Sequence, residues 1–213
     1  MRTGILGGTF NPIHLAHLAI AEEARRACRL DRVIFLPAAA PPHKPIADEV
    51  PFDQRLAMVK LALTEHPGFC VSDLEAQRSG KSYSVETLDI LQRRYPDDEF
   101  YFIIGLDSFR DLATWKSYEK LFRLAHLVVV SRPGISTDLR QLLPIAIRHE
   151  FCYSAESKNL RHGSGKTVIF LDETLLEISS TEIRQRVAAH QTILDLVPAA
   201  VADYIDRHGL YEG

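Results

Sequence analysis

The sequence has few cysteines and no long apolar run. The first feature argues against a disulfide-rich secreted protein, and the second argues against a membrane-spanning one. Only three cysteines occur in 213 residues, and Cys28, Cys70 and Cys152 lie far apart with no C-x-x-C spacing. An odd number of scattered thiols favours reduced cysteines in the cytoplasm over a disulfide-stapled secreted domain. Because no stretch of about 18 apolar residues occurs, we expect no membrane span. The glycine-broken N-terminus is not typical of a signal peptide.

Basic residues are also not in excess. The chain has 25 Lys and Arg against 28 Asp and Glu, which gives a formal net charge of -3, and it contains no basic run. A general nucleic-acid-binding protein needs clustered basic and aromatic residues, so the composition argues against that class while leaving a local basic site possible. With 46% hydrophobic and 25% charged residues, the chain has the composition of a globular protein that can bury a sizeable core.

Short apolar runs alternate with helical patterns along most of the chain. Strands are predicted at 4–6, 33–36, 69–71, 100–104, 127–130 and 168–171, and helices at 15–28, 53–63, 82–94, 181–190 and 198–208. This alternation predicts an α/β fold, a Rossmann-like doubly wound parallel sheet with helices on both faces. We expect residues 1–213 to form a single domain whose small C-terminal helical part covers about 179–213. Ligands of such sheets bind outside the carboxyl ends of the strands.

The N-terminal segment joins a strand to a helix through two glycines and carries two histidines. Gly7 and Gly8 follow the strand, and His14 and His17 follow at a spacing of three. Glycines let the backbone approach phosphate oxygens, a helix start directs N–H groups at an anion, and positions i and i+3 share one helical face. The segment therefore indicates a triphosphate site, with a solvated strand-to-helix turn as the alternative. A metal site is not favoured, since no third ligand stands at a recognised spacing.

A second candidate phosphate site lies at 178–184, where the sequence reads I-S-S-T-E-I-R. Ser179 and Glu182 fit the capping box that begins a helix. The same hydroxyls and N–H groups can hold phosphate oxygens, and Arg184 adds a forked cation for that purpose. Taken alone the segment favours capping, but beside the N-terminal motif phosphate binding becomes the better interpretation.

Two further segments follow predicted strands. In 105–115, Asp107 could accept hydrogen bonds from ribose hydroxyls or could cap the next helix. Trp115 is the only tryptophan and could either stack on a planar ring or belong to the core. The segment P-P-H-K at 41–44 holds Lys44 in a loop stiffened by prolines, which could serve an anion or simply be solvated.

Residues 163–167 read G-S-G-K-T and resemble the end of a phosphate-binding P-loop. A P-loop needs a further glycine where this chain has Leu160, and it opens a helix after a strand. Because this segment precedes a predicted strand instead, we reject the P-loop interpretation. The region from about 134 to 167 gives no readable pattern otherwise.

The segments at 7–17 and 178–184 together resemble the nucleotidyltransferase superfamily, which carries [HT]-x-G-H and I-S-S-T-x-[LI]-R signatures. Within it the chain is similar to the bacterial nicotinate-nucleotide adenylyltransferases nearly end to end, and 41–44 and 105–115 match further family segments. Two departures stand out: Ala16 replaces the signature glycine, and Asn11 replaces a common aspartate. A single added methyl group is a small intrusion, so we expect a tolerated variant.

The resemblance implies transfer of the adenylyl group of ATP to nicotinate mononucleotide, a step of NAD biosynthesis that also releases pyrophosphate. It implies Mg²⁺ with the ATP. The alternatives are a pantetheine-phosphate adenylyltransferase, which is a shorter chain, a cytidylyltransferase, and a non-catalytic nucleotide sensor of the same fold.

The resemblance also implies a set of site residues. His14, His17, Lys44 and Arg184 are the expected catalytic residues. ATP is expected to contact Gly8, Thr9, Phe10, His14, His17, Gly105, Asp107, Ile178, Ser180, Thr181 and Arg184. Nicotinate mononucleotide is expected to contact Lys44, Ser84, Thr87 and Trp115. In this assignment the histidines bind the phosphate chain, Asp107 holds the ribose of ATP, and Trp115 stacks on the pyridine ring.

Overall fold

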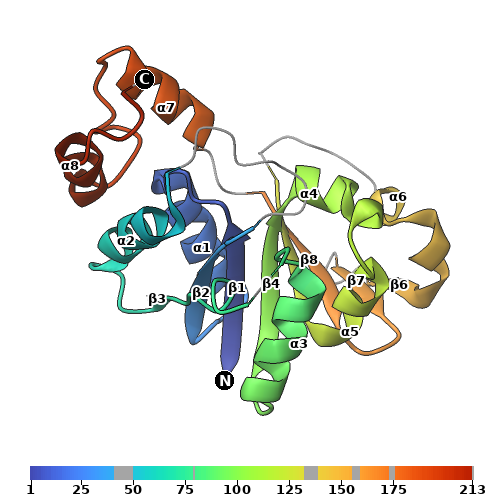
Figure 1. Cartoon of the computed structure of the whole chain (residues 1–213). Coiled ribbons are helices and arrows are strands. Elements are labelled where there is room, and N and C mark those ends of the chain that lie inside the picture. Colours follow the sequence, from blue (N-terminus) through green and yellow to red (C-terminus); the bar gives the residue numbers. More distant parts are fainter. Residues whose placement is uncertain (41–49, 79, 132–138, 155–158, 173–175, 213) are drawn as a thin grey trace. The chain divides into compact units, whose positions relative to one another are not determined.

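The computed structural model of the chain describes residues 1–40, 50–78, 80–131, 139–154, 159–172 and 176–212 (Figure 1). Its strands are β1 (Arg2–Gly8), β2 (Arg32–Pro37), β3 (Phe69–Val71), β4 (Glu99–Gly105), β5 (His126–Val130), β6 (Phe151–Ser154), β7 (Asn159–His162) and β8 (Thr167–Leu171). Its α-helices are α1 (Leu15–Ala27), α2 (Phe52–Leu63), α3 (Ser84–Arg94), α4 (Leu106–Arg110), α5 (Leu121–Leu124), α6 (Leu139–Leu142), α7 (Ser180–Ala188) and α8 (Ala199–Arg207). Short 3₁₀ helices are η1 (Leu112–Thr114), η2 (Tyr118–Lys120) and η3 (Ile145–Glu150).

The strands form one sheet in the order β3-β2-β1-β4-β5-β8-β7-β6. From β1 the strands follow in chain order through β2 and β3 on one side and through β4, β5 and β8 on the other. This is the doubly wound arrangement that the alternating pattern predicts. β1 pairs with β4, β4 with β5 and β5 with β8, all in parallel. The register aligns Leu6 with Ile103 and Ile103 with Val128. The prediction of an α/β fold is therefore confirmed.

The region that gives no sequence pattern adds an antiparallel edge to this sheet. β6 pairs antiparallel with β7, and β7 pairs antiparallel with β8. The glycine-containing segment at 163–167 makes the turn between β7 and β8, where Gly165 has a φ of 91°. Since this segment connects two strands and opens no helix, the rejection of a P-loop is confirmed.

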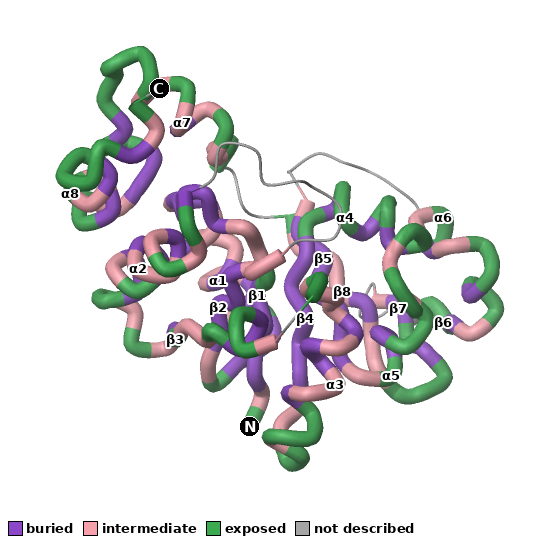
Figure 2. Tube along the Cα trace, in the orientation of Figure 1, coloured by how far each residue is buried: buried purple, intermediate pink, exposed green. Residues whose placement is uncertain are grey.

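The central strands are buried because their side chains are apolar on both faces. β5 is buried along its whole length, and β4 is buried from its second to its sixth residue (Figure 2). Such continuous apolar runs are typical of the inner strands of parallel sheets. Gly4 in β1 fits this close packing, because a Cβ there would lie 2.8 Å from Leu30 Cδ1.

The chain divides into two compact units, each assembled from separate segments. The first unit contains Met1–Leu6, Ala21–Val33 and Tyr83–Leu175, and the second contains Gly7–Ile20, Ile34–Ser82 and Leu176–Gly213. Neither unit is a continuous stretch of sequence. No described helix is both long and apolar enough to cross a membrane.

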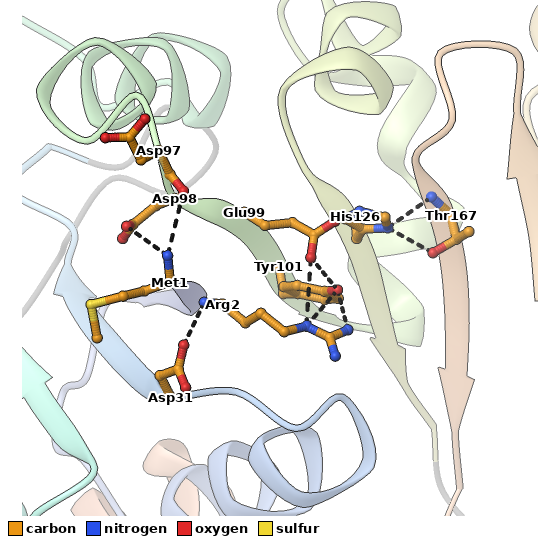
Figure 3. A network of polar contacts seen from close by, with 9 residues as sticks. All are labelled: Met1, Arg2, Asp31, Asp97, Asp98, Glu99, Tyr101, His126 and Thr167. Atoms are coloured by element: carbon orange, nitrogen blue, oxygen red, sulfur yellow. Dashed lines mark hydrogen bonds and ion pairs between the residues drawn. The ribbon is translucent and has the colours of Figure 1, made fainter.

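A polar network occupies the amino ends of four strands in the first unit (Figure 3). Arg2 begins β1, Glu99 begins β4, His126 begins β5 and Thr167 begins β8. His126 Nε2 lies 3.0 Å from a Glu99 oxygen, and Arg2 donates to the Tyr101 hydroxyl. Burial alone would raise the pKa of Glu99, but hydrogen bonds from Tyr101 and His126 hold it below its usual value. We assign this network a structural role at the sheet end opposite the carboxyl ends of these strands.

Candidate phosphate-binding site

The turn after β1 is set by Gly8 and by the buried ring of Phe10. Phe10 is 2% exposed and has a φ of 49°, which is in the left-handed region. That backbone conformation costs a non-glycine residue about 1–2 kcal/mol, so burial of its ring must hold it there. A Cβ on Gly8 would lie 3.0 Å from the Phe10 ring, which explains why the turn has glycine at this position.

The two predicted histidines lie against each other at the start of α1. The His14 and His17 rings are stacked with centroids 3.6 Å apart. The His14 backbone N–H donates to His17 Nδ1 over 3.3 Å. Since Nδ1 of His17 accepts this bond, the proton of the neutral His17 ring sits on Nε2. The arrangement leaves His17 Nε2 as a hydrogen-bond donor.

Both imidazoles are held neutral at pH 7. Burial lowers the pKa of His14 to about 4. Burial, with a smaller contribution from His14, also lowers the pKa of His17 well below its usual value. Within the described part of the chain, His14 Nδ1 is a buried atom with no hydrogen-bond partner. An unmade bond of this kind costs free energy, and a ligand that supplies the partner would recover it.

The lowered pKa of His14 predicts a loss of stability in mild acid. The unfolded chain binds a proton near pH 6.5, whereas the folded chain binds it only near pH 4. Between these values the unfolded state carries more protons, so the free energy of unfolding falls as the pH is lowered. We expect His14 to contribute a loss of about 3 kcal/mol between pH 7 and pH 4.

Urea unfolding at pH 7, 5.5 and 4 measures this loss, with His14→Gln as the comparison. The variant should show a flatter dependence over this range than the parent chain. Parallel curves for the two proteins would contradict the assignment.

The start of α7 is bonded directly to the segment that leads into His14. The Ser180 hydroxyl donates to the Pro12 carbonyl over 2.9 Å. Arg184 Nη1 donates to the Asn11 carbonyl over 2.8 Å, and its Nη2 lies 3.3 Å from the Thr181 hydroxyl. The two signature segments, more than 160 positions apart, therefore meet within the second unit.

The predicted cap of α7 is also present. Ser179 is the N-cap, and its side chain accepts a hydrogen bond from the Glu182 N–H over 3.1 Å. The capping and phosphate-site interpretations are compatible, because capping uses Ser179 while Ser180, Thr181 and Arg184 face the turn or lie beside it. Ile178 precedes the cap and is half-buried.

Sequence reasoning missed two residues that support the same turn. Arg55 of α2 is 1% exposed, and its Nη1 donates to the Thr9 carbonyl over 2.6 Å. Tyr211 donates to Asn11 Oδ1 over 2.7 Å. Burial raises the pKa of the Tyr211 hydroxyl, against the effect of nearby Arg184 and Arg55.

The inward face of α2 differs from the predicted one, and this difference explains why Arg55 was missed. Within the predicted helix 53–63, the sequence favours Leu56, Val59, Leu61 and Leu63 as the apolar positions, after a cap at Asp53. In the structure the buried positions are Arg55, Met58, Val59, Ala62 and Leu63, and the N-cap is Pro51 without a side-chain bond. The sequence signal for a buried Arg55 is its helical spacing of three, four and seven residues from the apolar positions Met58, Val59 and Ala62.

The predicted ribose contact lies in the first unit. Gly105 is the N-cap of α4 and provides no side-chain bond. Asp107 is in the first turn of α4, where its side chain is 96% exposed and pairs with Arg110 over 3.5 Å. Because its side chain is almost fully exposed, the Asp107 carboxylate is accessible to a ligand hydroxyl.

Three of the four residues predicted to bind the pyridine nucleotide, Ser84, Thr87 and Trp115, lie in the first unit as well. Ser84 begins α3 and is half-buried, and Thr87 is buried one turn later. The segment after Trp115 reaches this helix, because Lys116 pairs with Glu86 over 2.6 Å. Trp115 is half-buried, with its ring 6.3 Å from that of Phe102. The tryptophan is thus neither a fully buried core residue nor fully solvated.

Lys44 and the rest of the 41–44 segment lie outside the described residues, so the structure places neither. Over the ranges that it does describe, no group of three or more His, Cys, Asp or Glu could hold a metal ion. Mg²⁺ is commonly bound through substrate phosphates rather than by an all-protein cage.

Comparison with known proteins first identifies the class. A family model described as cytidylyltransferase-like matches residues 5–186. That match covers the turn, both histidines and Arg184, and it makes the chain a member of a nucleotidyltransferase superfamily.

Curated relatives narrow the class to one family. A protein of Syntrophotalea carbinolica named "Probable nicotinate-nucleotide adenylyltransferase" is 59% identical, over 99% of this chain and 97% of its own. A protein of Citrifermentans bemidjiense with the same name is 54% identical, over 99% and 98%. The chain belongs to the nicotinate-nucleotide adenylyltransferase family.

Solved structures agree on the fold. The nicotinic acid mononucleotide adenylyltransferase of Plasmodium falciparum, complexed with NaAD, matches with a TM-score of 0.75 and 20% identity, over 99% of this chain and 97% of that one. The same protein complexed with APC matches with a TM-score of 0.73. At this identity the likeness concerns the fold alone.

Proposed function

We infer that this chain transfers the adenylyl group of ATP to nicotinate mononucleotide, giving nicotinate adenine dinucleotide and pyrophosphate in NAD biosynthesis. The observation that carries the inference is the meeting of the two signature segments through Ser180 and Arg184. Pantetheine-phosphate adenylyltransferase is the weaker alternative, because relatives with more than half of their positions identical carry the nicotinate-nucleotide name. We treat the two units as one nucleotidyltransferase domain, since the family model spans segments of both.

The reaction needs positioning and charge neutralisation rather than a covalent enzyme intermediate. A phosphate oxygen of nicotinate mononucleotide forms a bond to the α-phosphorus of ATP, and the bond from that phosphorus to the bridging oxygen breaks as pyrophosphate leaves. The nucleophile is already ionised at neutral pH, so no general base is required. Such transfers depend mainly on orientation and electrostatic stabilisation.

We assign the second unit to the triphosphate. His17 donates through Nε2 to the α-phosphate, and His14 binds the same phosphate chain. Gly8, Thr9 and Phe10 shape the turn, and Ile178, Ser180 and Thr181 present the start of α7. Arg184 neutralises charge on the β- and γ-phosphates with its guanidinium group, whose fork suits phosphate oxygens.

We assign the first unit to the sugar and the acceptor. Gly105 and Asp107 bind the ATP ribose, for which the exposed carboxylate of Asp107 is an acceptor. Trp115 stacks on the pyridine ring, and the start of α3 with Ser84 and Thr87 receives its carboxylate. We further assign Lys44 to phosphate. A carboxylate on the ring favours backbone N–H donors over paired donor and acceptor groups, so we expect nicotinate to be preferred over nicotinamide mononucleotide.

Members of this family generally use a divalent metal ion with ATP. We propose that the ion is Mg²⁺, which would enter with the phosphates of ATP. It would neutralise charge on the departing pyrophosphate. We also propose a cytoplasmic location, which suits the free thiols of Cys28, Cys70 and Cys152.

Replacing Trp115 with alanine should raise KM for nicotinate mononucleotide about 10- to 100-fold, because base-type stacking on an aromatic ring is worth about 1–3 kcal/mol. KM for ATP should stay near its original value. Steady-state kinetics with each substrate varied in turn measure both constants. Trp115→Phe keeps an aromatic face and should recover most of the affinity. Equal rises in both Michaelis constants would contradict the assignment.

The proposed function is tested by pyrophosphate release from ATP and Mg²⁺. The acceptors compared are nicotinate mononucleotide, nicotinamide mononucleotide, phosphopantetheine and none. Release with nicotinate mononucleotide alone, or with it at far higher kcat/KM, is the expected result. Preferential release with phosphopantetheine would establish the alternative, and release with no acceptor would point to hydrolysis. Equal efficiency with the two pyridine nucleotides would refute the proposed selectivity only.

A further inference from the structure

We propose that Arg55 is a positioning residue that fixes the orientation of the His17 imidazole through Thr9 and Phe10. The proposal rests on the proposed function for the role of His17 toward ATP. Arg55 lies 38 positions beyond His17 in the sequence, on α2, and belongs to neither signature segment.

Arg55 is buried and donates hydrogen bonds to two backbone oxygens. Its Nη1 donates to the Thr9 carbonyl over 2.6 Å, and its Nε donates to the Val50 carbonyl over 3.2 Å. The guanidinium carbon also lies 5.5 Å from the centre of the Phe52 ring. A planar guanidinium can serve two such acceptors at fixed angles, which an ammonium group cannot do equally well.

The Thr9 carbonyl belongs to the peptide bond between Thr9 and Phe10, and Phe10 is the strained residue of the turn. Phe10 follows immediately with its φ of 49°, and pinning the preceding carbonyl restricts rotation of that planar peptide. The bond from Arg55 therefore helps to keep Phe10 in a conformation that an isolated chain would rarely adopt.

The Phe10 ring in turn contacts His17. The two ring centres are 5.0 Å apart with an interplanar angle of 74°, an edge contact. The Phe10 ring also packs near the Phe35 ring, with the two ring centres 5.8 Å apart. His17 thus lies between the stacked His14 ring and Phe10, and Arg55 restrains the backbone that carries Phe10. Binding groups held by supporting residues in this way keep their productive geometry.

Arg55→Lys tests the proposal while keeping the positive charge. We expect the affinity for ATP, measured by calorimetry without acceptor, to fall about 10-fold or more, since a charge-assisted hydrogen bond is worth about 1.5–3 kcal/mol. Long-range ¹H–¹⁵N spectra of the labelled histidines should show His17 changing from one Nε2–H tautomer to a mixture. KM for nicotinate mononucleotide should stay within twofold.

The matched control is Arg186→Met on α7, where the arginine pairs with Glu182 and Asp195. It should leave ATP affinity and the His17 spectrum unchanged. A folded Arg55→Lys protein with unchanged ATP affinity and an unchanged His17 tautomer would overturn the proposal. A change in melting temperature alone, with both readouts unchanged, would overturn it as well, since it would make Arg55 structural only.

Phe10→Leu tests the coupling between Arg55 and His17 if the Arg55→Lys variant does not fold. It removes the ring between Arg55 and His17, so the same loss of ATP affinity and the same mixed tautomer are expected. Unchanged readouts in this variant would refute the coupling. Because both readouts are taken without acceptor, they remain interpretable even if the parent chain fails to release pyrophosphate with nicotinate mononucleotide, which would refute the proposed function instead.

Discussion

Replacing His17 with alanine should lower kcat by about 10²–10³-fold while the fold stays intact. The expectation follows from the fixed Nε2–H of His17, a donor that is already oriented before ATP binds. Loss of one such preorganised donor to transition-state charge typically costs a factor of this size. Single-turnover and steady-state rates with ATP and nicotinate mononucleotide measure it.

His149→Ala is the matched control for this variant. His149 lies exposed in η3 of the first unit and has no place in the proposed site. Its removal should leave kcat within twofold of the parent value. Near-normal turnover in the His17→Ala protein, with far-ultraviolet dichroism unchanged in both variants, would defeat the assignment of His17.

Replacing Arg184 with methionine should lower kcat/KM for ATP by about 10²-fold or more. Two effects combine in this residue: the guanidinium holds the Asn11 carbonyl over 2.8 Å, and in the proposed site it supplies positive charge to the β- and γ-phosphates. Hydrogen bonds to charged groups contribute about 1.5–3 kcal/mol each, so losing the turn contact and the phosphate contact together gives an effect of this order.

Arg184→Lys separates the two effects. Lysine retains the charge but lacks the fork, so we expect kcat/KM for ATP to lie between the parent and the methionine variant, with the largest recovery at low ionic strength. If the lysine and methionine variants were equally impaired at every salt concentration, Arg184 would act through the turn alone. If both matched the parent, neither role would hold.

Most of the fold could be predicted from the sequence because apolar runs and glycine or proline breaks mark its inner strands. The predicted strand at 69–71 coincides with β3, and the helix predicted at 15–28 ends one residue early in α1. The antiparallel strand β7 could not be predicted, since Leu160 is its one apolar residue and stands between Asn159 and Arg161. β6 lies at the edge of the sheet next to β7, so without β7 its short run F-C-Y had no predicted partner. Their register depends on pairing with β8, which is not a local signal.

Some residues of the candidate site are marked by local sequence patterns, and others are recognised only from their long-range contacts. His14, His17 and Arg184 could be predicted because they stand in short segments with a helix start and a definite spacing. Arg55 and Tyr211 could not, since their roles come from bonds to Thr9 and Asn11 that no local pattern encodes. The neutral state of His14 likewise follows from burial rather than from its neighbours in sequence.

The bonds that hold the turn also bear on the order in which a ribosome delivers this chain. The ribosome synthesises three residues of these bonds long after both histidines: Ser180, Arg184 and Tyr211. Each of them contacts Asn11 or Pro12. A nascent polypeptide that ends before α7 lacks these three anchors, even though its early strands have already emerged. We therefore expect the growing chain to acquire tight capture of ATP late in translation.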